Sequence, residues 1–296
     1  MNATDRSPHI LVFDSGVGGL SVLTHLQREL PRANYTYVMD DEWCPYGEKT
    51  DDILLSRIMS VIGRAIELCQ PQLVVIACNT ASTLAMEALR ETFALPFVGV
   101  VPALKPAVEN TASGAVVLLA TAATVDRDYV DDLWCAVGGQ RRLIKVACSD
   151  LVLLAEEKLR GRDVSADQLA CVLRAIDVEC SRSLSASAQD DESISAFVLG
   201  CTHFPLLRDE LESAWSQPCL WFDSGAAIAR RVLSLVAAPE FDAGARALSQ
   251  RDRCNRSSQW WCTSRASNED LYEVFRKLGM TPAGRLPEAC EGVPAA

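Results

Sequence analysis

Short apolar runs alternate with longer amphipathic stretches along most of this chain, and this alternation restricts the fold more than any other feature. In the first part of the chain the predicted strands are His9–Phe13, Tyr35–Asp40, Leu73–Ala77 and Phe97–Val101. The predicted helices between them are Leu20–Leu30, Ile53–Leu68 and Thr83–Phe93. Apolar strands separated by helices of this length predict βαβ units, and therefore a parallel sheet covered by helices.

The same alternation starts again in the second part of the chain. The predicted strands are Ala115–Ala120, Leu143–Ala147, Ala196–Leu199, Leu220–Phe222 and an edge strand at Trp260–Thr263. The predicted helices are Thr124–Trp134, Leu151–Leu159, Ala166–Cys180, Leu206–Ala214, Ala226–Val236 and Glu269–Leu278. The segment Val74–Thr80 also resembles Phe197–His203, since each is an apolar strand followed by a small residue, a cysteine and two polar residues. This echo predicts two α/β halves, each presenting a cysteine at the carboxyl end of a strand, where ligands bind in such folds.

Composition and charge argue against several classes of function. No apolar run approaches the roughly 18 residues of a membrane helix, and the polar start Met1–Pro8 does not resemble a signal peptide. We therefore expect a cytoplasmic protein without a membrane segment. The net charge of −11 opposes nucleic-acid binding. It also means that an anionic substrate needs a locally favourable pocket, such as the start of a helix.

The chain has twelve cysteines, which we expect to be free thiols in a reducing cytoplasm. No C-x-x-C pair is present, and His9, His25 and His203 are far apart in sequence, so no metal site is expected. Most of the cysteines lie in apolar helical patterns that are typical of small buried side chains.

A glycine-rich segment, Asp14–Ser21, follows the first predicted strand and opens the next helix. Its three glycines permit a tight turn and a close approach of the backbone, and the helix start offers N–H groups to an anion. The segment lacks the Gly-Lys-Ser/Thr ending of a P-loop and the complete G-x-G-x-x-G pattern. Its spacing fits an anion-binding turn and a plain strand-to-helix connection equally well.

Cys78 and Cys201 each follow a predicted strand and precede a predicted helix. At that position the helix dipole is expected to lower the pKa of the thiol and raise its thiolate fraction. His203, two residues beyond Cys201, can hold or donate a proton there. Asp14 can do the same for Cys78 if the first and third strands are neighbours. A single cysteine of this kind is often inert, but two in matched contexts favour acid/base chemistry.

Racemisation at the α-carbon of an amino acid is a reaction that needs two such groups. One base removes a proton from one face and an acid returns a proton to the other face, so a thiolate and a thiol exchange roles with direction. Oriented N–H groups and hydroxyls in a dry cleft would stabilise the carbanion.

Four motifs in order resemble those of the glutamate racemases of the aspartate/glutamate racemase superfamily, in their proteobacterial type. They are Phe13–Val22, Pro45–Lys49, Ala77–Ser82 and Gly200–Leu206, supported by Val98–Ala107 and Asp223–Arg231. The resemblance covers roughly residues 9 to 236. It implies an isomerase that converts L-glutamate to D-glutamate for peptidoglycan, with no cofactor, no pyridoxal phosphate and no metal.

The resemblance also implies roles for the matching residues. Cys78 and Cys201 would act on opposite faces of the α-carbon, with Asp14 assisting Cys78 and His203 assisting Cys201. Glu156 is expected to be an acidic residue that assists Cys78. The implied substrate-binding residues are Asp14, Ser15, Tyr46, Gly47, Asn79, Thr80, Thr121, Thr124, Thr202 and His203, with Tyr46 and the Gly47 backbone on the far carboxylate.

The implied fold consists of two Rossmann-like, three-layer α/β/α domains with parallel sheets, related by pseudo-symmetry, with the active site between them. One domain would combine residues 1–101 with residues 215–296, and the other would span residues 102–214. The partners expected are the small substrate and, as an open possibility, a cell-wall precursor acting as activator. A monomer or a homodimer is expected.

Two positions depart from the pattern of the superfamily. Ala123 stands where relatives usually carry glycine, which leaves open whether the carboxylate-binding loop is shifted. Cys44, after Trp43 and before Pro45, is either a third reactive thiol or a packing residue.

Three alternatives remain open from the sequence. Aspartate is the alternative substrate, since it differs from glutamate by one methylene group. A pyridoxal-phosphate racemase would need a Schiff-base lysine, and only Lys49 lies near a motif. A non-catalytic binding protein on the same fold is the third alternative.

Overall fold

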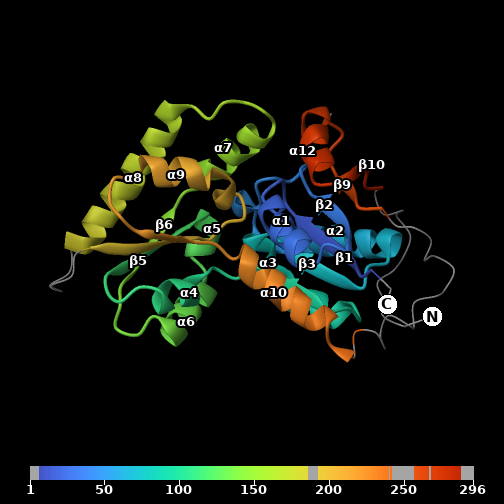
Figure 1. Cartoon of the computed structure of the whole chain (residues 1–296), viewed down its shortest axis with the longest axis horizontal. Coiled ribbons are helices and arrows are strands. Elements are labelled where there is room, and N and C mark those ends of the chain that lie inside the picture. The colour runs from blue at the N-terminus through green and yellow to red at the C-terminus, as the bar shows by residue number, and fades with distance from the viewer. Residues whose placement is uncertain (1–6, 186–192, 240, 242–256, 267, 288–296) are drawn as a thin grey trace.

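The computed structural model describes residues 7–185, 193–239, 241, 257–266 and 268–287. These residues form two parallel β-sheets with helices packed on both faces of each sheet (Figure 1). The two domains lie side by side, and the chain passes from the first to the second and back again (Figure 1). The predicted fold class is confirmed.

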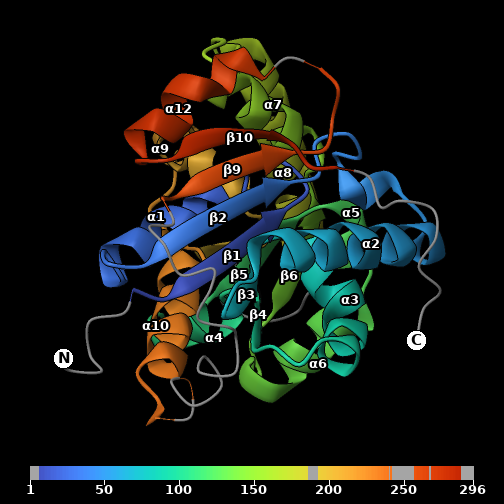
Figure 2. The same ribbon diagram turned by 90° about the vertical axis from the view of Figure 1, so that its right-hand side faces the viewer.

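The first sheet has six strands in the order β10-β9-β2-β1-β3-β4, all paired in parallel (Figure 2). Its strands are β1 (His9–Asp14), β2 (Asn34–Met39), β3 (Leu73–Ile76), β4 (Phe97–Gly99), β9 (Gln259–Cys262) and β10 (Thr281–Arg285). The strand predicted at Trp260–Thr263 exists as β9, but it is not at the edge because β10 pairs along its outer side. β10 was not predicted, since Pro282 and Gly284 interrupt its pattern.

The helices of the first domain cover both faces of this sheet. One face carries α1 (Leu20–Glu29), α10 (Gly225–Val236), η4 (Glu269–Leu271) and α12 (Tyr272–Lys277), and the other carries α2 (Asp51–Cys69) and α3 (Asn79–Thr92). Side chains of β1 alternate between the two cores: Val12 packs with α1 and Phe13 with α2. The sheet is therefore buried on both faces, which explains why its strands are continuously apolar.

The second sheet has four strands in the order β6-β5-β7-β8, again all parallel. They are β5 (Ala115–Ala120), β6 (Leu143–Ala147), β7 (Ile194–Leu199) and β8 (Leu220–Phe222). One face is covered by α7 (Asp150–Leu159), α8 (Ala166–Ser185), η2 (Phe204–Leu207) and α9 (Arg208–Ala214). The other face carries α4 (Leu104–Glu109), α5 (Ala122–Val125) and α6 (Asp128–Val137).

The assignment of residues 215–296 to the first domain is wrong for β8, because β8 pairs with β7 of the second sheet. The chain returns to the first domain only with α10, which packs against α1. The helix predicted at Thr124–Trp134 is divided into α5 and α6, with Arg127 in an extended conformation before α6. Among the described residues, no helix is both long and apolar enough to span a membrane.

Candidate active site

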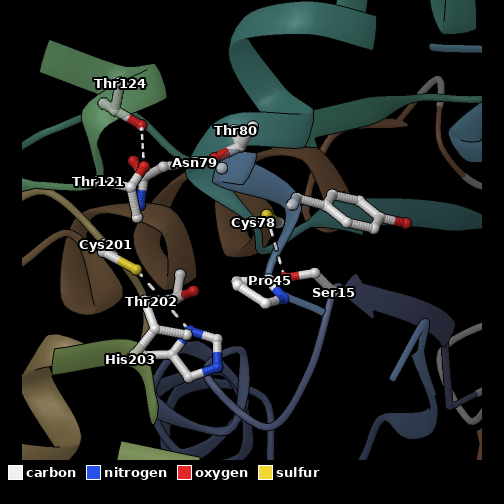
Figure 3. Close-up of a pocket in the computed structure, with 13 residues that line it drawn as sticks. Ser15, Pro45, Cys78, Asn79, Thr80, Thr121, Thr124, Cys201, Thr202 and His203 are labelled. Carbon is white, nitrogen blue, oxygen red and sulfur yellow. Dashed lines mark hydrogen bonds between the residues drawn. The ribbon is translucent and has the colours of Figure 1, made fainter. Parts of the chain in front are cut away.

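A pocket with about 310 Å³ of empty space, part of it open to solvent, is lined by residues that follow the carboxyl ends of β1, β3, β5 and β7, among others (Figure 3). The first domain lines it with Ser15, Pro45, Tyr46, Gly47, Cys78, Asn79 and Thr80. The second domain contributes Thr121, Thr124, Val152, Cys201, Thr202 and His203. Cys78 and Cys201, which lie in the two similar sequence segments, therefore line one cavity from different domains.

Cys78 is the residue immediately before α3 and is buried. Its Sγ atom lies 3.6 Å from the Ser15 hydroxyl oxygen. Burial raises the pKa of the Cys78 thiol to about 12, with a further contribution from the Asp14 carboxylate, although hydrogen bonds from the Ala81 N–H and from Ser15 oppose the shift. The expectation of a lowered pKa is therefore wrong for Cys78, because desolvation outweighs the helix terminus.

Asp14, the last residue of β1, is fully buried and connects the two domains. Its Oδ1 accepts hydrogen bonds from the Ser15 hydroxyl at 3.1 Å and from the Gly16 N–H at 3.3 Å. Its Oδ2 accepts one from the Thr202 hydroxyl of the second domain at 2.9 Å. Burial raises the pKa of Asp14 to about 6, against the opposing effects of His203 and these donors. β1 and β3 are neighbours, and Ser15 bridges Asp14 to Cys78.

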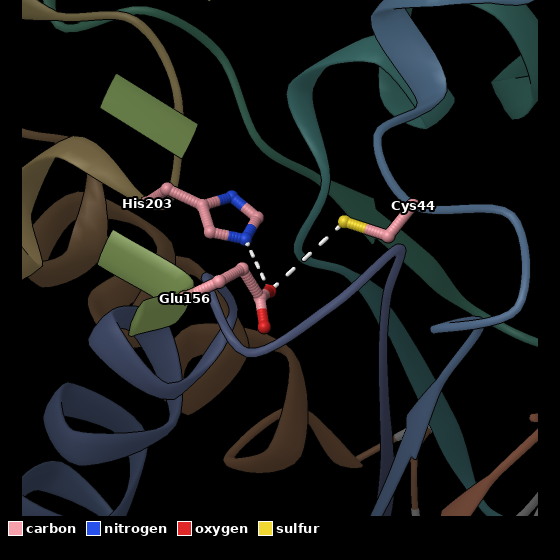
Figure 4. A group of neighbouring side chains, drawn as sticks. All are labelled: Cys44, Glu156 and His203. Carbon is pink, nitrogen blue, oxygen red and sulfur yellow. Dashed lines mark hydrogen bonds and ion pairs between the residues drawn. The ribbon is translucent and has the colours of Figure 1, made fainter. Parts of the chain in front are cut away.

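Cys201 follows β7 and has a buried histidine beside it. The Cys201 Sγ atom lies 3.7 Å from His203 Nδ1 (Figure 3). His203 Nε2 lies 2.9 Å from Glu156 Oε1 (Figure 4). Burial lowers the pKa of His203, but its contacts with Cys201 and Glu156 outweigh burial and hold the pKa well above the usual value. An imidazolium is therefore placed where it would stabilise a thiolate on Cys201.

Glu156, on α7, lies on the side of the pocket that carries Cys201. Its Oε1 contacts His203 and also accepts the Val17 N–H at 2.8 Å. Burial opposes its ionisation, yet hydrogen bonds from His203 and Val17 and the charge of Arg160 lower the pKa of Glu156. The expectation of a helper near Cys78 is thus wrong, because His203 holds this carboxylate behind Cys201.

The glycines of the glycine-rich segment allow its backbone to pass close to the side chains of His203 and Glu156. A Cβ atom on Gly18 would lie 2.7 Å from Cε1 and 2.8 Å from Cγ of His203. A Cβ atom on Gly16 would collide with the Glu156 carboxylate. Hence the segment makes room for the His203–Glu156 pair, a role that the sequence did not predict.

Polar groups for a zwitterionic ligand line the remaining walls of the pocket. Asn79 Oδ1 is buried and has no hydrogen-bond partner within the described part of the chain. The Thr121 and Thr124 hydroxyl groups lie 3.1 Å apart (Figure 3). A Cβ atom on Gly47 would lie 3.2 Å from Thr121 Oγ1, so the Gly47 backbone faces these hydroxyls. Thr80 is buried at the same wall.

Tyr46 lines the pocket, and its hydroxyl group belongs to a buried hydrogen-bond network. It donates to Asp40 Oδ2 at 2.6 Å. Asp40 is fully buried and also accepts from Arg57 at 2.6 and 2.9 Å and from the Thr263 hydroxyl at 2.6 Å. The Tyr46 hydroxyl group is therefore engaged by Asp40, and the predicted contact of Tyr46 with the far carboxylate would have to be made by the rest of the residue.

Sequence reasoning missed the Asp40 network, which connects the Tyr46–Glu48 turn (η1) to Thr263, directly after β9 in the distant C-terminal segment. Asp41 adds to it, accepting bonds from Thr263, Ser264 and Asn268. The available signal was the position of Asp40 directly after β2, which is next to β1 in the sheet.

The two departures from the superfamily pattern have structural explanations. Ala123 lies inside α5, and of the non-glycine residues within the described ranges only Gln70 has a positive φ, so alanine fits this loop without strain. Cys44 is partly buried, and its Sγ atom lies 4.0 Å from Glu156 Oε1 (Figure 4). It therefore lies beside the His203–Glu156 pair without lining the pocket itself.

Comparisons with known proteins agree with this geometry. Residues 19–232 match the family described as Asp/Glu/Hydantoin racemase. The chain is 44% identical over 285 residues to a glutamate racemase of Salmonella enteritidis, covering 96% of this chain and 94% of that protein. It is 45% identical over 230 residues to a glutamate racemase of Pectobacterium carotovorum, covering 78% of this chain and 77% of the relative.

A solved structure is similar over nearly the whole chain. It is the crystal structure of Escherichia coli glutamate racemase in complex with L-glutamate and the activator UDP-MurNAc-Ala, at 36% identity and a TM-score of 0.82. The match covers 96% of this chain and 100% of that structure. With the family match spanning most of the chain, this chain belongs to the Asp/Glu/Hydantoin racemase family.

Proposed function

We propose that this chain interconverts L-glutamate and D-glutamate without a cofactor, using Cys78 and Cys201 as opposed acid and base. The observation that carries the proposal is that the two cysteines line one pocket from different domains, each with its own proton-handling partner. Glutamate rather than aspartate is supported by the names of the relatives that match over nearly the full chain.

In the proposed mechanism, Cys201 acts as the thiolate base in one direction. The neighbouring His203 imidazolium, held by Glu156, stabilises the thiolate that removes the α-proton. The electron pair of the broken C–H bond stays on the α-carbon, and Cys78, kept as a thiol by burial, delivers its proton to the opposite face. The reverse reaction exchanges the roles of the two cysteines.

The substrate is proposed to be held by the unpaired and hydroxyl-bearing groups of the pocket. Asn79 Oδ1, a buried acceptor without a partner in the described residues, suits the substrate ammonium group. The N–H groups at the start of α3 and the Thr121 and Thr124 hydroxyls are suited to carboxylates. This arrangement supplies local attraction for an anion in a protein whose net charge is −11.

The proposed biological role is the supply of D-glutamate for peptidoglycan. Regulation by a cell-wall precursor is proposed too, on the strength of the activator present in the Escherichia coli structure. We propose a cytoplasmic location, because a two-thiol mechanism needs a reducing compartment.

Chiral chromatography of L-glutamate incubated with the purified chain, without added cofactor, tests the proposal. D-glutamate should appear, L-aspartate should react far more slowly, and Cys78→Ser or Cys201→Ser should lower the rate by about 10²- to 10⁴-fold. Cys171→Ser, at an exposed position, is the matched control and should keep the full rate. Turnover that survives in both active-site variants would overturn the mechanism, and preferred turnover of aspartate would overturn the substrate.

A further inference from the structure

Three potential metal ligands converge beside the pocket: Cys44, Glu156 and His203, here named the Cys44 cluster (Figure 4). Their ligand atoms all lie within 4.8 Å of one another. Glu156 Oε1 is the shared neighbour, 2.9 Å from His203 Nε2 and 4.0 Å from Cys44 Sγ. The proposed reaction uses His203 and Glu156 but has no role for Cys44.

The three donor atoms gather around Gly16, which has no side chain to separate them. A Cβ atom on Gly16 would lie 3.1 Å from Cys44 Sγ and 3.2 Å from His203 Nε2, and closest to Glu156 Oε1. The donors therefore point toward one location from three separate segments: the loop after β2, α7 and the turn after β7.

We propose that the Cys44 cluster is a binding site for Zn²⁺. A thiolate, an imidazole and a carboxylate form a ligand set that Zn²⁺ accepts, with a water molecule as the fourth ligand. Zinc bonds of about 2.0 Å to nitrogen and oxygen and about 2.3 Å to sulfur put tetrahedral donor atoms roughly 3.3 to 3.7 Å apart. The distances of 2.9 and 4.0 Å lie on either side of that range, and Cys44 Sγ and His203 Nε2 lie within 4.8 Å of each other. Side-chain movements on the order of 1 Å would bring the three donors to these separations.

The surroundings already orient two of the ligands. His203 Nδ1 lies 3.7 Å from Cys201 Sγ, so the ring presents Nε2 to the cluster. Glu156 Oε1 is held by the Val17 N–H, and Oε2 lies 3.7 Å from Arg160. The charge of Arg160 is offset by Asp270, 2.9 Å away. Partners of this kind fix ligand orientation at metal sites.

Zinc bound there would inhibit the racemase, and this consequence rests on the proposed function. The metal would occupy His203 Nε2 and the Glu156 carboxylate, which together support the thiolate of Cys201. Binding itself does not depend on racemase activity. Cys44 thus makes the proposed racemase activity of this chain sensitive to zinc.

Calorimetric titration of the reduced full chain with ZnCl₂ measures binding, and racemase assays in the same zinc series measure inhibition. We expect one tight site per chain and parallel inhibition that EDTA reverses. Cys44→Ala should weaken that site by more than about 100-fold and remove the inhibition, since loss of even an outer-shell partner costs about 10- to 100-fold. Its racemase activity without zinc should be unchanged.

Cys171→Ala, at an exposed cysteine, is the matched control and should bind zinc as the wild type does. Co²⁺ as a spectroscopic probe should give a thiolate charge-transfer band that Cys44→Ala loses. Equal zinc binding by the wild type and Cys44→Ala would overturn the proposal and point to the catalytic thiols. So would the absence of a tight site in the wild type. Zinc binding that depends on Cys44 in a chain without racemase activity would support the site and refute the proposed function.

Discussion

His203 Nε2 lies 2.9 Å from Glu156 Oε1, and this contact joins parts of the chain that are far apart in sequence. The same carboxylate oxygen accepts the N–H of Val17 in the glycine-rich segment of the other domain. On its other side, His203 faces Cys201. The imidazole beside Cys201 is therefore coupled to the contact between the domains.

Glu156→Gln should move the alkaline limb of the pH profile of kcat to lower pH. The carboxylate raises the pKa of His203, so without it the imidazolium loses its proton at a lower pH. We expect kcat to fall by roughly 10-fold or more, because the free energy of a lost charged hydrogen bond corresponds to a change of that size. Glu157→Gln, which alters an exposed carboxylate paired with Arg162, is the control. A profile identical to that of the wild type would contradict the assigned role.

Asp14→Asn should stabilise the fold while lowering activity. Because burial raises the pKa of Asp14 from 3.8 to about 6, the folded state holds this proton more tightly than the unfolded state. The stability gained from protonation is complete below pH 3.8 and is lost as pH rises through 6. At neutral pH, the free energy of unfolding is lower by at most about 3 kcal/mol than it would be with Asp14 protonated.

Urea unfolding at two pH values measures this effect. The free energy of unfolding of Asp14→Asn should exceed that of the wild type by more at pH 7.5 than at pH 5, because the variant has no carboxylate to desolvate. A variant that is less stable than the wild type at pH 7.5 would show that the hydrogen bonds of Asp14 outweigh its burial.

Tyr46→Phe should reduce stability and leave catalysis nearly intact. The hydroxyl group donates to the buried Asp40 at 2.6 Å, and the loss of such a bond costs about 1–3 kcal/mol. Thermal unfolding and steady-state kinetics measure the two effects, with Tyr272→Phe, at a half-exposed position, as the control. A large rise in KM at unchanged stability would instead assign the hydroxyl to the substrate.

Gly18→Ala should lower kcat by about 100-fold, which is the expected cost of displacing a catalytic group by about 1 Å. The new Cβ atom would come within 3 Å of three ring atoms of His203 and push the ring from its place beside Cys201. Gly63→Ala, whose Cβ atom would touch only the ring edge of Phe93, is the control. Full activity in Gly18→Ala would contradict the requirement for a fixed His203.

The sequence predicted most of the fold because buried parallel strands are continuously apolar. The strands Ala115–Ala120, Leu143–Ala147 and Leu220–Phe222 begin and end where the pattern placed them. β10 was missed, since it carries Pro282 and Gly284 and is partly exposed at the edge of the sheet. The domain assignment of β8 depends on tertiary pairing, which the pattern of a three-residue strand does not reveal.

Some residues of the candidate site could be predicted from the sequence, and others could not. Cys78, Cys201 and Asp14 could be found because each closes or follows a strand, so topology brings each of them to the ligand-binding edge of its own sheet. The partners of Glu156 and Tyr46 could not be found, because those side chains meet residues brought close only by packing. The pKa of Cys78 was misjudged because sequence shows the helix start but not the depth of burial.

The isotope content of the first product molecules tests the two-thiol mechanism most directly. L-glutamate is converted in D₂O to a small extent, and the two enantiomers are separated and analysed by mass spectrometry. Because the thiol that delivers the proton is not the group that removed it, D-glutamate should carry deuterium at the α-carbon while the remaining L-glutamate keeps protium. D-glutamate that retains the original protium would mean that a single group carries the proton between faces, which would contradict the opposed roles of Cys78 and Cys201.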